Sequence, residues 1–186
     1  MRIGVLFLSV SLASAMPAWA QSRAPRVEVF AGYSVLPGDR IDDFPRTTTS
    51  HGVQFDASVN VNRWFGVLAD LGIQSSTNRD LGPSFAGLVA RTRVTEFLVG
   101  PRFVGRSERL NFFGHGLVGW ARGDAGDDFS GFSDTKPTFG GGVGVDVHLR
   151  DRVGVRGQFD LLASFADIVE GNTRFAVGVV LALGGS

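Results

Sequence analysis

Val53-Gln54-Phe55-Asp56-Ala57-Ser58-Val59-Asn60-Val61-Asn62 is the stretch that decides the fold, because every odd position is apolar and every even position is polar. A period of two residues is the signature of a β-strand, in which successive side chains point to opposite faces. The stretch therefore predicts a strand with one apolar face and one polar face.

The same alternation recurs along the rest of the chain and predicts eight strands. Tight turns and longer loops alternate between these strands, as in barrels of the bacterial outer membrane, where the short turns face the periplasm. The predicted fold class is therefore all-β, an eight-stranded antiparallel up-and-down transmembrane β-barrel. The expected strands cover residues of about 26–36, 51–62, 64–75, 92–105, 109–122, 137–149, 153–165 and 172–183. The longer loops are expected at 37–50, 75–91, 124–136 and 166–171.

The first residues have the pattern of a secretory signal peptide. A basic start at Met1-Arg2 precedes an apolar run, and Ala18-Trp19-Ala20 places small residues at the two positions that a signal peptidase reads. We expect cleavage after Ala20, which makes 1–20 a signal peptide and 21–186 a single outer-membrane β-barrel domain. Because the chain has no cysteine, we expect neither a disulfide framework nor a lipoprotein anchor.

Charge and hydropathy exclude two broad classes of protein. Lysine and arginine total 18 and aspartate and glutamate total 18, so the chain lacks the basic excess that nucleic-acid binding requires. After the signal peptide, no segment approaches the 18 or so consecutive apolar residues of a helical membrane span. Membrane embedding must then use strands, and only a closed barrel satisfies the backbone hydrogen bonds of strands in hydrocarbon.

The polar face of the strands carries charges of both signs. Buried charges must be paired or hydrated, and eight strands enclose an interior that side chains just fill. We therefore predict a mixed-sign, salt-bridged plug inside the barrel, with glycines on the same face making room for long arginine side chains. The predicted members of this network are Glu28, Asp56, Asp70, Glu96, Arg102, His115, Asp146, His148, Arg156, Asp160 and Arg174.

Aromatic residues on the apolar face fall into two belts. Aromatic girdles lie at both interfaces of a membrane barrel, whereas a soluble barrel has no reason to sort its surface aromatics by height. Periodicity by itself leaves open an inside-out soluble barrel whose apolar face lines a ligand pocket. The predicted girdle residues are Tyr33, Phe97, Trp120, Phe139 and Phe175 near the long loops, and Phe65, Phe103 and Phe112 near the short turns.

Residues suited to catalysis or metal binding are sparse. The only histidines are His51, His115 and His148, and no His/carboxylate spacing of the metalloenzyme kind occurs. A barrel enzyme that modifies lipid A would need a serine, a histidine and usually a carboxylate within reach of the lipid. His115 and His148 are expected to face inward, and His51 has no obvious serine or acid partner. We expect no catalytic residues, no metal site and no cofactor.

Four segments resemble a bacterial family of outer membrane protein β-barrel domains, related in fold to the OmpA-type and OmpX-type small barrels. They are Val29-Phe30-Ala31-Gly32-Tyr33-Ser34, Val59-Asn60-Val61-Asn62-Arg63-Trp64-Phe65-Gly66, Phe97-Leu98-Val99-Gly100-Pro101-Arg102-Phe103 and Gly140-Gly141-Gly142-Val143-Gly144-Val145-Asp146. The resemblance implies a porin-like superfamily fold and an outer-membrane location, and it implies little about activity. Many such barrels end in an aromatic residue that the insertion machinery reads. This sequence ends Leu181-Ala182-Leu183-Gly184-Gly185-Ser186, which would move that signal to an internal strand.

The function that we expect from the sequence is non-enzymatic: a structural or surface-interaction role exercised through the extracellular loops. The alternatives are a narrow passive pore for small solutes, a lipid-modifying barrel enzyme and a soluble periplasmic ligand-binding barrel. The expected partners are outer-membrane lipid or lipopolysaccharide and, during insertion, the barrel-assembly machinery. We expect a monomer that reaches the cell outer membrane after export, binds no nucleic acid and has a loop partner of unknown identity.

Overall fold

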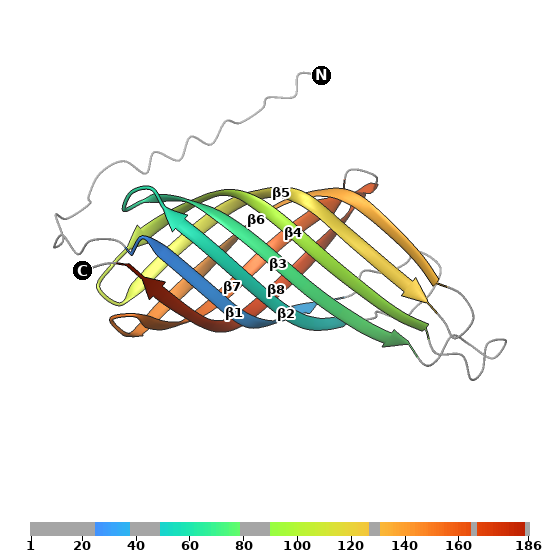
Figure 1. Ribbon diagram of the computed structural model, residues 1–186, viewed down its shortest axis with the longest axis horizontal. Helices are drawn as coiled ribbons and strands as arrows, with labels where there is room; N and C mark the ends of the chain where they lie inside the picture. The colour runs from blue at the N-terminus through green and yellow to red at the C-terminus, as the bar shows by residue number, and fades with distance from the viewer. Residues whose placement is uncertain (1–24, 38–48, 79–89, 127–130, 165–166, 185–186) are drawn as a thin grey trace, which may run out of the picture.

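The computed structural model describes residues 25–37, 49–78, 90–126, 131–164 and 167–184, and the predicted signal peptide lies outside them. The described residues form eight strands (Figure 1). These are β1 (Val27–Leu36), β2 (Ser50–Asn60), β3 (Phe65–Asn78), β4 (Ala90–Arg106), β5 (Leu110–Gly126), β6 (Gly131–Arg150), β7 (Val153–Ser164) and β8 (Asp167–Leu183).

The strands close into a barrel in which each pairs with its neighbours in the sequence. All pairings are antiparallel, and β1 closes the barrel against β8, with Val27 opposite Leu183 and Val35 opposite Phe175. Over the paired part of the barrel, closure removes the two free edge strands that an open sheet would have. The predicted eight-stranded antiparallel barrel is thus confirmed. The described part of the chain contains no helix long and apolar enough to span a membrane.

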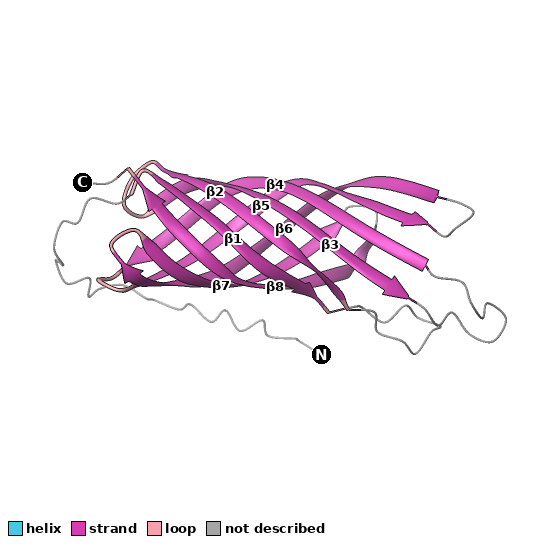
Figure 2. Cartoon of the chain, turned by 60° about the horizontal axis from the view of Figure 1, so that its bottom comes forward, coloured by secondary structure: helices cyan, strands magenta, loops and turns pink. Residues whose placement is uncertain are grey.

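The two ends of the barrel differ (Figure 2). Strand β1 begins and β8 ends at the end that also carries the short turns between β2 and β3, β4 and β5, and β6 and β7. In the first of these turns the side-chain oxygen of Asn62 accepts hydrogen bonds from the backbone N–H groups of Trp64 at 2.9 Å and Phe65 at 2.8 Å. We call this the short-turn end and the opposite one the long-loop end.

Several strands extend further at the long-loop end than the sequence indicates. Strand β5 continues to Gly126 and β6 begins at Gly131, so the expected loop 124–136 is largely a strand hairpin. Strand β8 begins at Asp167, inside the expected loop 166–171. Beyond a membrane, both faces of a strand meet water, so alternation of apolar and polar residues gives no signal there.

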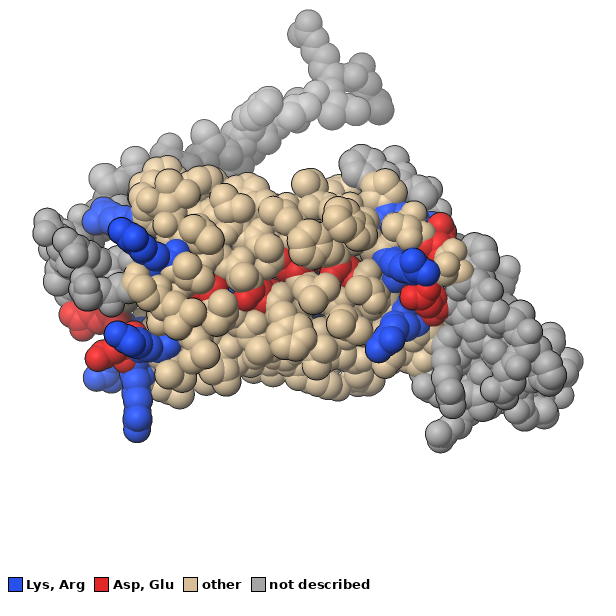
Figure 3. Space-filling view, viewed as in Figure 1, with Lys and Arg blue, Asp and Glu red and all other residues tan. Residues whose placement is uncertain are grey.

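The apolar face of the barrel points outward and the polar face points inward. Val53, Phe55 and Val59 of β2 are 42%, 45% and 57% exposed, whereas Gln54 and Asp56 between them are buried. On the face seen in Figure 3, the arginines and lysines lie at the two ends, and the band between them consists mostly of uncharged side chains, with some acidic atoms visible between them. The inside-out arrangement with an apolar ligand pocket is therefore not the one that this chain adopts.

The interior also contains an apolar patch. Leu68, Leu98, Leu117 and Leu162 point inward from four strands and form one buried cluster. The barrel interior is thus filled by packed leucines as well as by charged side chains.

Candidate functional site in the barrel interior

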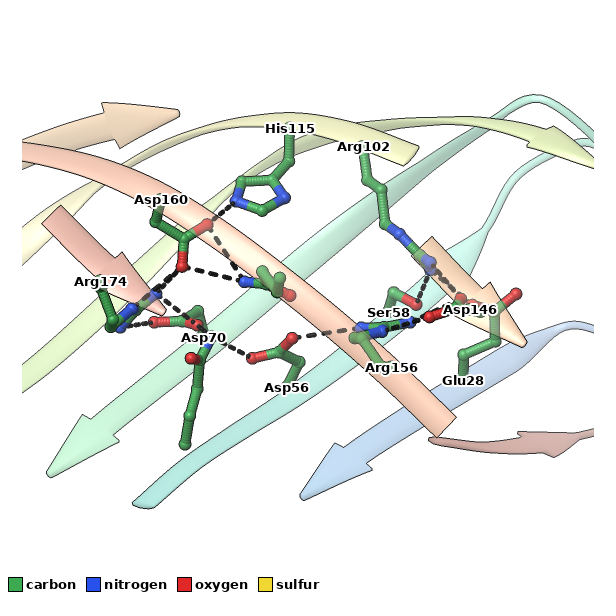
Figure 4. Close-up of polar contacts among 12 residues, drawn as sticks. Glu28, Asp56, Ser58, Asp70, Arg102, His115, Asp146, Arg156, Asp160 and Arg174 are labelled. Atoms are coloured by element: carbon green, nitrogen blue, oxygen red, sulfur yellow. Dashed lines mark hydrogen bonds and ion pairs between the residues drawn. The ribbon is translucent and has the colours of Figure 1, made fainter. Parts of the chain in front are cut away.

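Most of the buried charged residues form two groups inside the barrel (Figure 4). The short-turn cluster consists of Glu28, Ser58, Arg102, Asp146 and Arg156. The long-loop cluster consists of Asp70, Glu96, His115, Asp160 and Arg174.

In the short-turn cluster, two arginines share two carboxylates. Arg102 Nη1 donates to Glu28 and, at 3.0 Å, to the Ser58 hydroxyl, while its Nη2 donates to Asp146 at 3.2 Å. Arg156 grips the same Asp146 through Nε at 2.7 Å and Nη2 at 3.1 Å. The Nη2 of Arg156 also lies 3.6 Å from Glu28. Asp146 therefore has two guanidinium partners, and Glu28 has a third in Arg106, whose Nη1 lies 2.8 Å away.

A phenylalanine lies against both of these arginines. The guanidinium carbons of Arg102 and Arg156 are 4.3 Å and 4.5 Å from the centroid of the Phe113 ring. Stacking on an aromatic face stabilises a cation that has lost its water. It also allows two like charges to lie close together beside their shared carboxylates.

In the long-loop cluster, one arginine holds three carboxylates. The two Nη atoms of Arg174 each donate to Asp70 at 2.9 Å, and Nη1 also donates to Glu96 at 2.9 Å. Nε of Arg174 donates to Asp160 at 3.0 Å. The other oxygen of Asp160 lies 2.9 Å from His115 Nε2. Arg174 is fully buried and is the one arginine, among the described residues, that pairs with all three carboxylates.

Asp56 and Gln54 of β2 link the two clusters. Asp56 lies 3.2 Å from Arg156 Nη1 on one side and faces Asp70 across the β2–β3 pairing on the other. The side-chain amide of Gln54 donates to both carboxylates, at 3.1 Å to Asp56. The polar network is thus continuous along the described interior.

Glycines make room for these side chains at two places. A Cβ at Gly72 would lie 2.9 Å from Nη1 of Arg174 and 3.0 Å from Glu96, and one at Gly144 would collide with the Phe113 ring. Atoms this close would displace the guanidinium or the ring. Glycine on the inward face is therefore a packing requirement at these positions.

The structure brings ten of the eleven predicted network residues together, and His148 is the exception. His148 is half-buried near the end of β6, where the pairing with β7 shifts register between His148 and Arg150. Its backbone N–H donates to the Arg109 carbonyl, and among the described residues no hydrogen bond or ion pair joins its side chain to either cluster. Its place at the short-turn rim explains why it stands apart.

Sequence reasoning omitted several members of the network. Gln54, Ser58 and Gln158 share the inward parity of their strands but carry no charge, so the search for paired charges passed over them. Arg106, which lies 2.8 Å from Glu28, follows the expected end of its strand at 105. All four residues occupy inward-facing positions of the alternation, so the alternation would have identified them.

All eight predicted girdle residues lie on the outer face, and several contact one another. Phe97 and Trp120 lie 5.2 Å apart between ring centroids, and Phe65 and Phe103 lie 5.4 Å apart. Trp64, which was not predicted, stacks on Phe103 at 6.2 Å. Tyr33, Phe112 and Phe175 are about half exposed or more.

The described residues offer little for catalysis. His51 lies in β2 opposite Ser75 of β3, but its Nδ1 is 2.6 Å from the Tyr33 hydroxyl, and no side-chain hydrogen bond joins it to Ser75. A serine without a bonded base is a weak nucleophile. No group of three His, Cys, Asp or Glu within the described ranges is placed to hold a metal ion.

The sequence matches the model of a known protein family. A family model described as "Outer membrane protein beta-barrel domain" matches residues 5–182. A search of curated proteins found no match.

Solved structures share the fold at low sequence identity. The chain is similar to Ail, the attachment invasion locus protein of Yersinia pestis, with a TM-score of 0.59 and 11% identity over 85% of this chain and 98% of that one. It is similar to Neisserial surface protein A, with a TM-score of 0.58 and 10% identity over 84% and 97% of the two chains. OprG from Pseudomonas aeruginosa gives a TM-score of 0.55 and 11% identity over 88% and 98%.

Proposed function

Because this chain belongs to the outer membrane protein β-barrel domain family and is an outer-membrane protein, we propose that it is a non-enzymatic anchor whose long-loop end contacts other molecules at the cell surface. The observation that carries the proposal is the filled interior. Arg102, Arg156 and Arg174 are buried across the barrel lumen in contacts with carboxylates from several strands. Such a plug stabilises the wall and obstructs the axis, which leaves the ends as the working surfaces.

The absence of an activated nucleophile among the described side chains supports a non-enzymatic role. His51 bonds Tyr33, and His115 contacts Asp160 inside the barrel, where outer-leaflet lipid has no access. A lipid-modifying activity would change the lipid A of cells that express the protein, and mass spectrometry would detect the change. We expect identical lipid A spectra with and without expression.

We assign recognition to the long-loop end because it carries exposed polar and charged side chains and the longer connections. Among the described residues it presents Arg93, Arg122, Ser133 and Asp134 as exposed side chains. The segments expected to form the loops, 38–48 and 79–89 among them, lie outside the described residues. Outer-membrane barrels have their longer connections on the outside of the cell.

The test of the proposal separates the barrel from its loops. Segments 38–48 and 79–89 are replaced by short glycine-serine linkers, and a deletion strain is complemented with either the wild type or the shortened protein. We expect both proteins to reach the outer membrane and to show a faster-migrating band on gels without boiling, whereas only the wild type restores attachment of cells to surfaces and to one another. Attachment restored equally by the shortened protein would contradict a surface role for the loops.

A narrow passive pore is the second candidate, favoured by polar atoms inside the barrel. Gln54 Oε1, Gln74 Oε1, Gln158 Oε1 and His115 Nδ1 are buried without a hydrogen-bond partner among the described residues. Buried polar atoms of this kind are commonly satisfied by water. A continuous path of water through the barrel would require an opening beside the arginine clusters. Measuring ion conductance across a lipid bilayer distinguishes an open lumen from a closed one.

A further inference from the structure

The outer wall of the barrel is grooved over β5 to β8 and the adjoining β1. The groove has a volume of about 890 Å³, and its lining includes Phe112, Gly114, Val143, Gly157 and Phe159. Sites for small organic ligands usually measure about 300–1,000 Å³. The groove is therefore large enough for part of a lipid molecule, and its lining is mostly aliphatic and aromatic.

Two outward-facing glycines contribute to the groove. A Cβ at Gly157 would meet no heavy atom within 4 Å, and one at Gly114 would make only ordinary contacts, the nearest at 3.7 Å. Gly116 is equally open but does not line the groove. Larger side chains can therefore be placed inside or beside the groove without disturbing the backbone.

Arginines lie at the short-turn end of the same strands. Arg109 precedes β5, while Arg150 and Arg152 flank the turn between β6 and β7, and all three are exposed. The Arg109 carbonyl accepts a hydrogen bond of 2.9 Å from the backbone N–H of His148, which holds the two turns side by side. The three arginines therefore lie at one sector of the rim, below the part of the groove that Phe112 and Gly157 line, and the rest of the groove runs toward Tyr33 and Phe175 near the long-loop end.

The three arginines of this sector outnumber its two acidic residues. Within the described residues, no ion pair involves Arg109, Arg150 or Arg152, although Glu108 and Asp151 are also exposed nearby. At the long-loop end Arg122 lies 3.1 Å from Asp124 and Lys136 lies 4.0 Å from Asp134, while Arg93 resembles the short-turn arginines in having no ion pair among the described residues. The short-turn sector is thus open to an external anion.

The groove and the arginines together match one amphipathic molecule. Phe112 is three residues from Arg109, and Gly157 is five residues from Arg152, which at about 3.3 Å per residue corresponds to roughly 10–17 Å along the strands. We propose that this sector binds one anionic phospholipid of the periplasmic leaflet, with an acyl chain in the groove and the phosphate at the arginines. Guanidinium groups recognise phosphate oxygens through paired hydrogen bonds, and neighbouring hydrocarbon anchors the chain.

The experiment is native mass spectrometry of the folded barrel in detergent, titrated with phosphatidylglycerol or phosphatidylcholine. We expect one phosphatidylglycerol to bind more tightly than phosphatidylcholine. The variant R109Q/R150Q/R152Q should weaken phosphatidylglycerol binding by about tenfold or more, given the contribution of each arginine near an anionic headgroup. Gly157→Leu should weaken both lipids, because it fills the groove.

Two variants serve as matched controls. Gly116→Leu adds the same side chain to the same wall outside the groove, and R93Q/R122Q removes cations from the long-loop end; both should bind phosphatidylglycerol like the wild type. A faster-migrating unboiled band verifies that each variant is folded. The proposal fails if the wild type does not prefer phosphatidylglycerol, or if Gly157→Leu binds it as Gly116→Leu does.

Discussion

Both interior clusters pair buried carboxylates with arginines, but they differ in the number of arginines. In the short-turn cluster Glu28 and Asp146 share Arg102 and Arg156, and Phe113 lies against both cations. The long-loop cluster depends on a single guanidinium. There Asp70, Glu96 and Asp160 converge on Arg174, and His115 is the only other ion-pair partner among the described residues. Gln54 and Gln158 add neutral hydrogen-bond donors to Asp70 and Asp160. The first cluster is redundant and the second depends on one residue, so equal substitutions should have unequal effects.

The largest effect is expected for Arg174→Leu. This change leaves three buried carboxylates without their main partner, and breaking a buried ion pair costs about 3–5 kcal/mol. Urea unfolding of the barrel in lipid vesicles, followed by tryptophan fluorescence, measures the free energy of unfolding. Phe175→Leu, at the next position on the outer face, serves as the control and should change it far less.

A smaller loss, about 2–3 kcal/mol, is expected for Arg102→Leu. Glu28 keeps Arg106 at 2.8 Å and Arg156 at 3.6 Å, and Asp146 keeps both hydrogen bonds from Arg156. The same urea titration applies. If Arg102→Leu destabilised the barrel more than Arg174→Leu, the contrast between the two clusters would be wrong.

Neutralising one carboxylate in each cluster should also change the free energy of unfolding by different amounts. Asp146→Asn weakens charged hydrogen bonds to two arginines and should cost about 1.5–3 kcal/mol. Glu96→Gln keeps an oxygen that accepts from Arg174 and relieves repulsion among three carboxylates, so it should change stability by less than about 1 kcal/mol. Equal losses in the two variants would show that the long-loop cluster has no excess of negative charge.

Among the substitutions that remove a contact of the arginines, Phe113→Leu should have the smallest effect. Losing the ring that both Arg102 and Arg156 contact should cost about 1–2 kcal/mol through the two cation–π contacts. Phe112→Leu changes the neighbouring residue, which is 61% exposed on the outer face, and should cost less. Comparing the two unfolding midpoints isolates the contribution of the inward ring.

Local alternation predicted most of the fold. It also predicted which side chains of the site point inward, but not which of them meet across the barrel. The parity of Val53–Asn62 correctly assigned the inward and outward faces, and hairpin register places Asp146 opposite Arg156. The contacts of Arg174 with Asp70 and of Arg102 with Glu28 join strands that are not neighbours. They depend on the shear of the closed barrel, which no local pattern encodes.

We infer that the two clusters seal the interior, so that the barrel serves as an anchor and not as a channel. Planar-bilayer recording of the folded wild-type protein tests it most directly, with Arg174→Leu recorded alongside. We predict no reproducible conductance step for the wild type under an applied potential. Stable, uniform conductance steps from the wild-type protein would contradict the seal and favour the narrow pore.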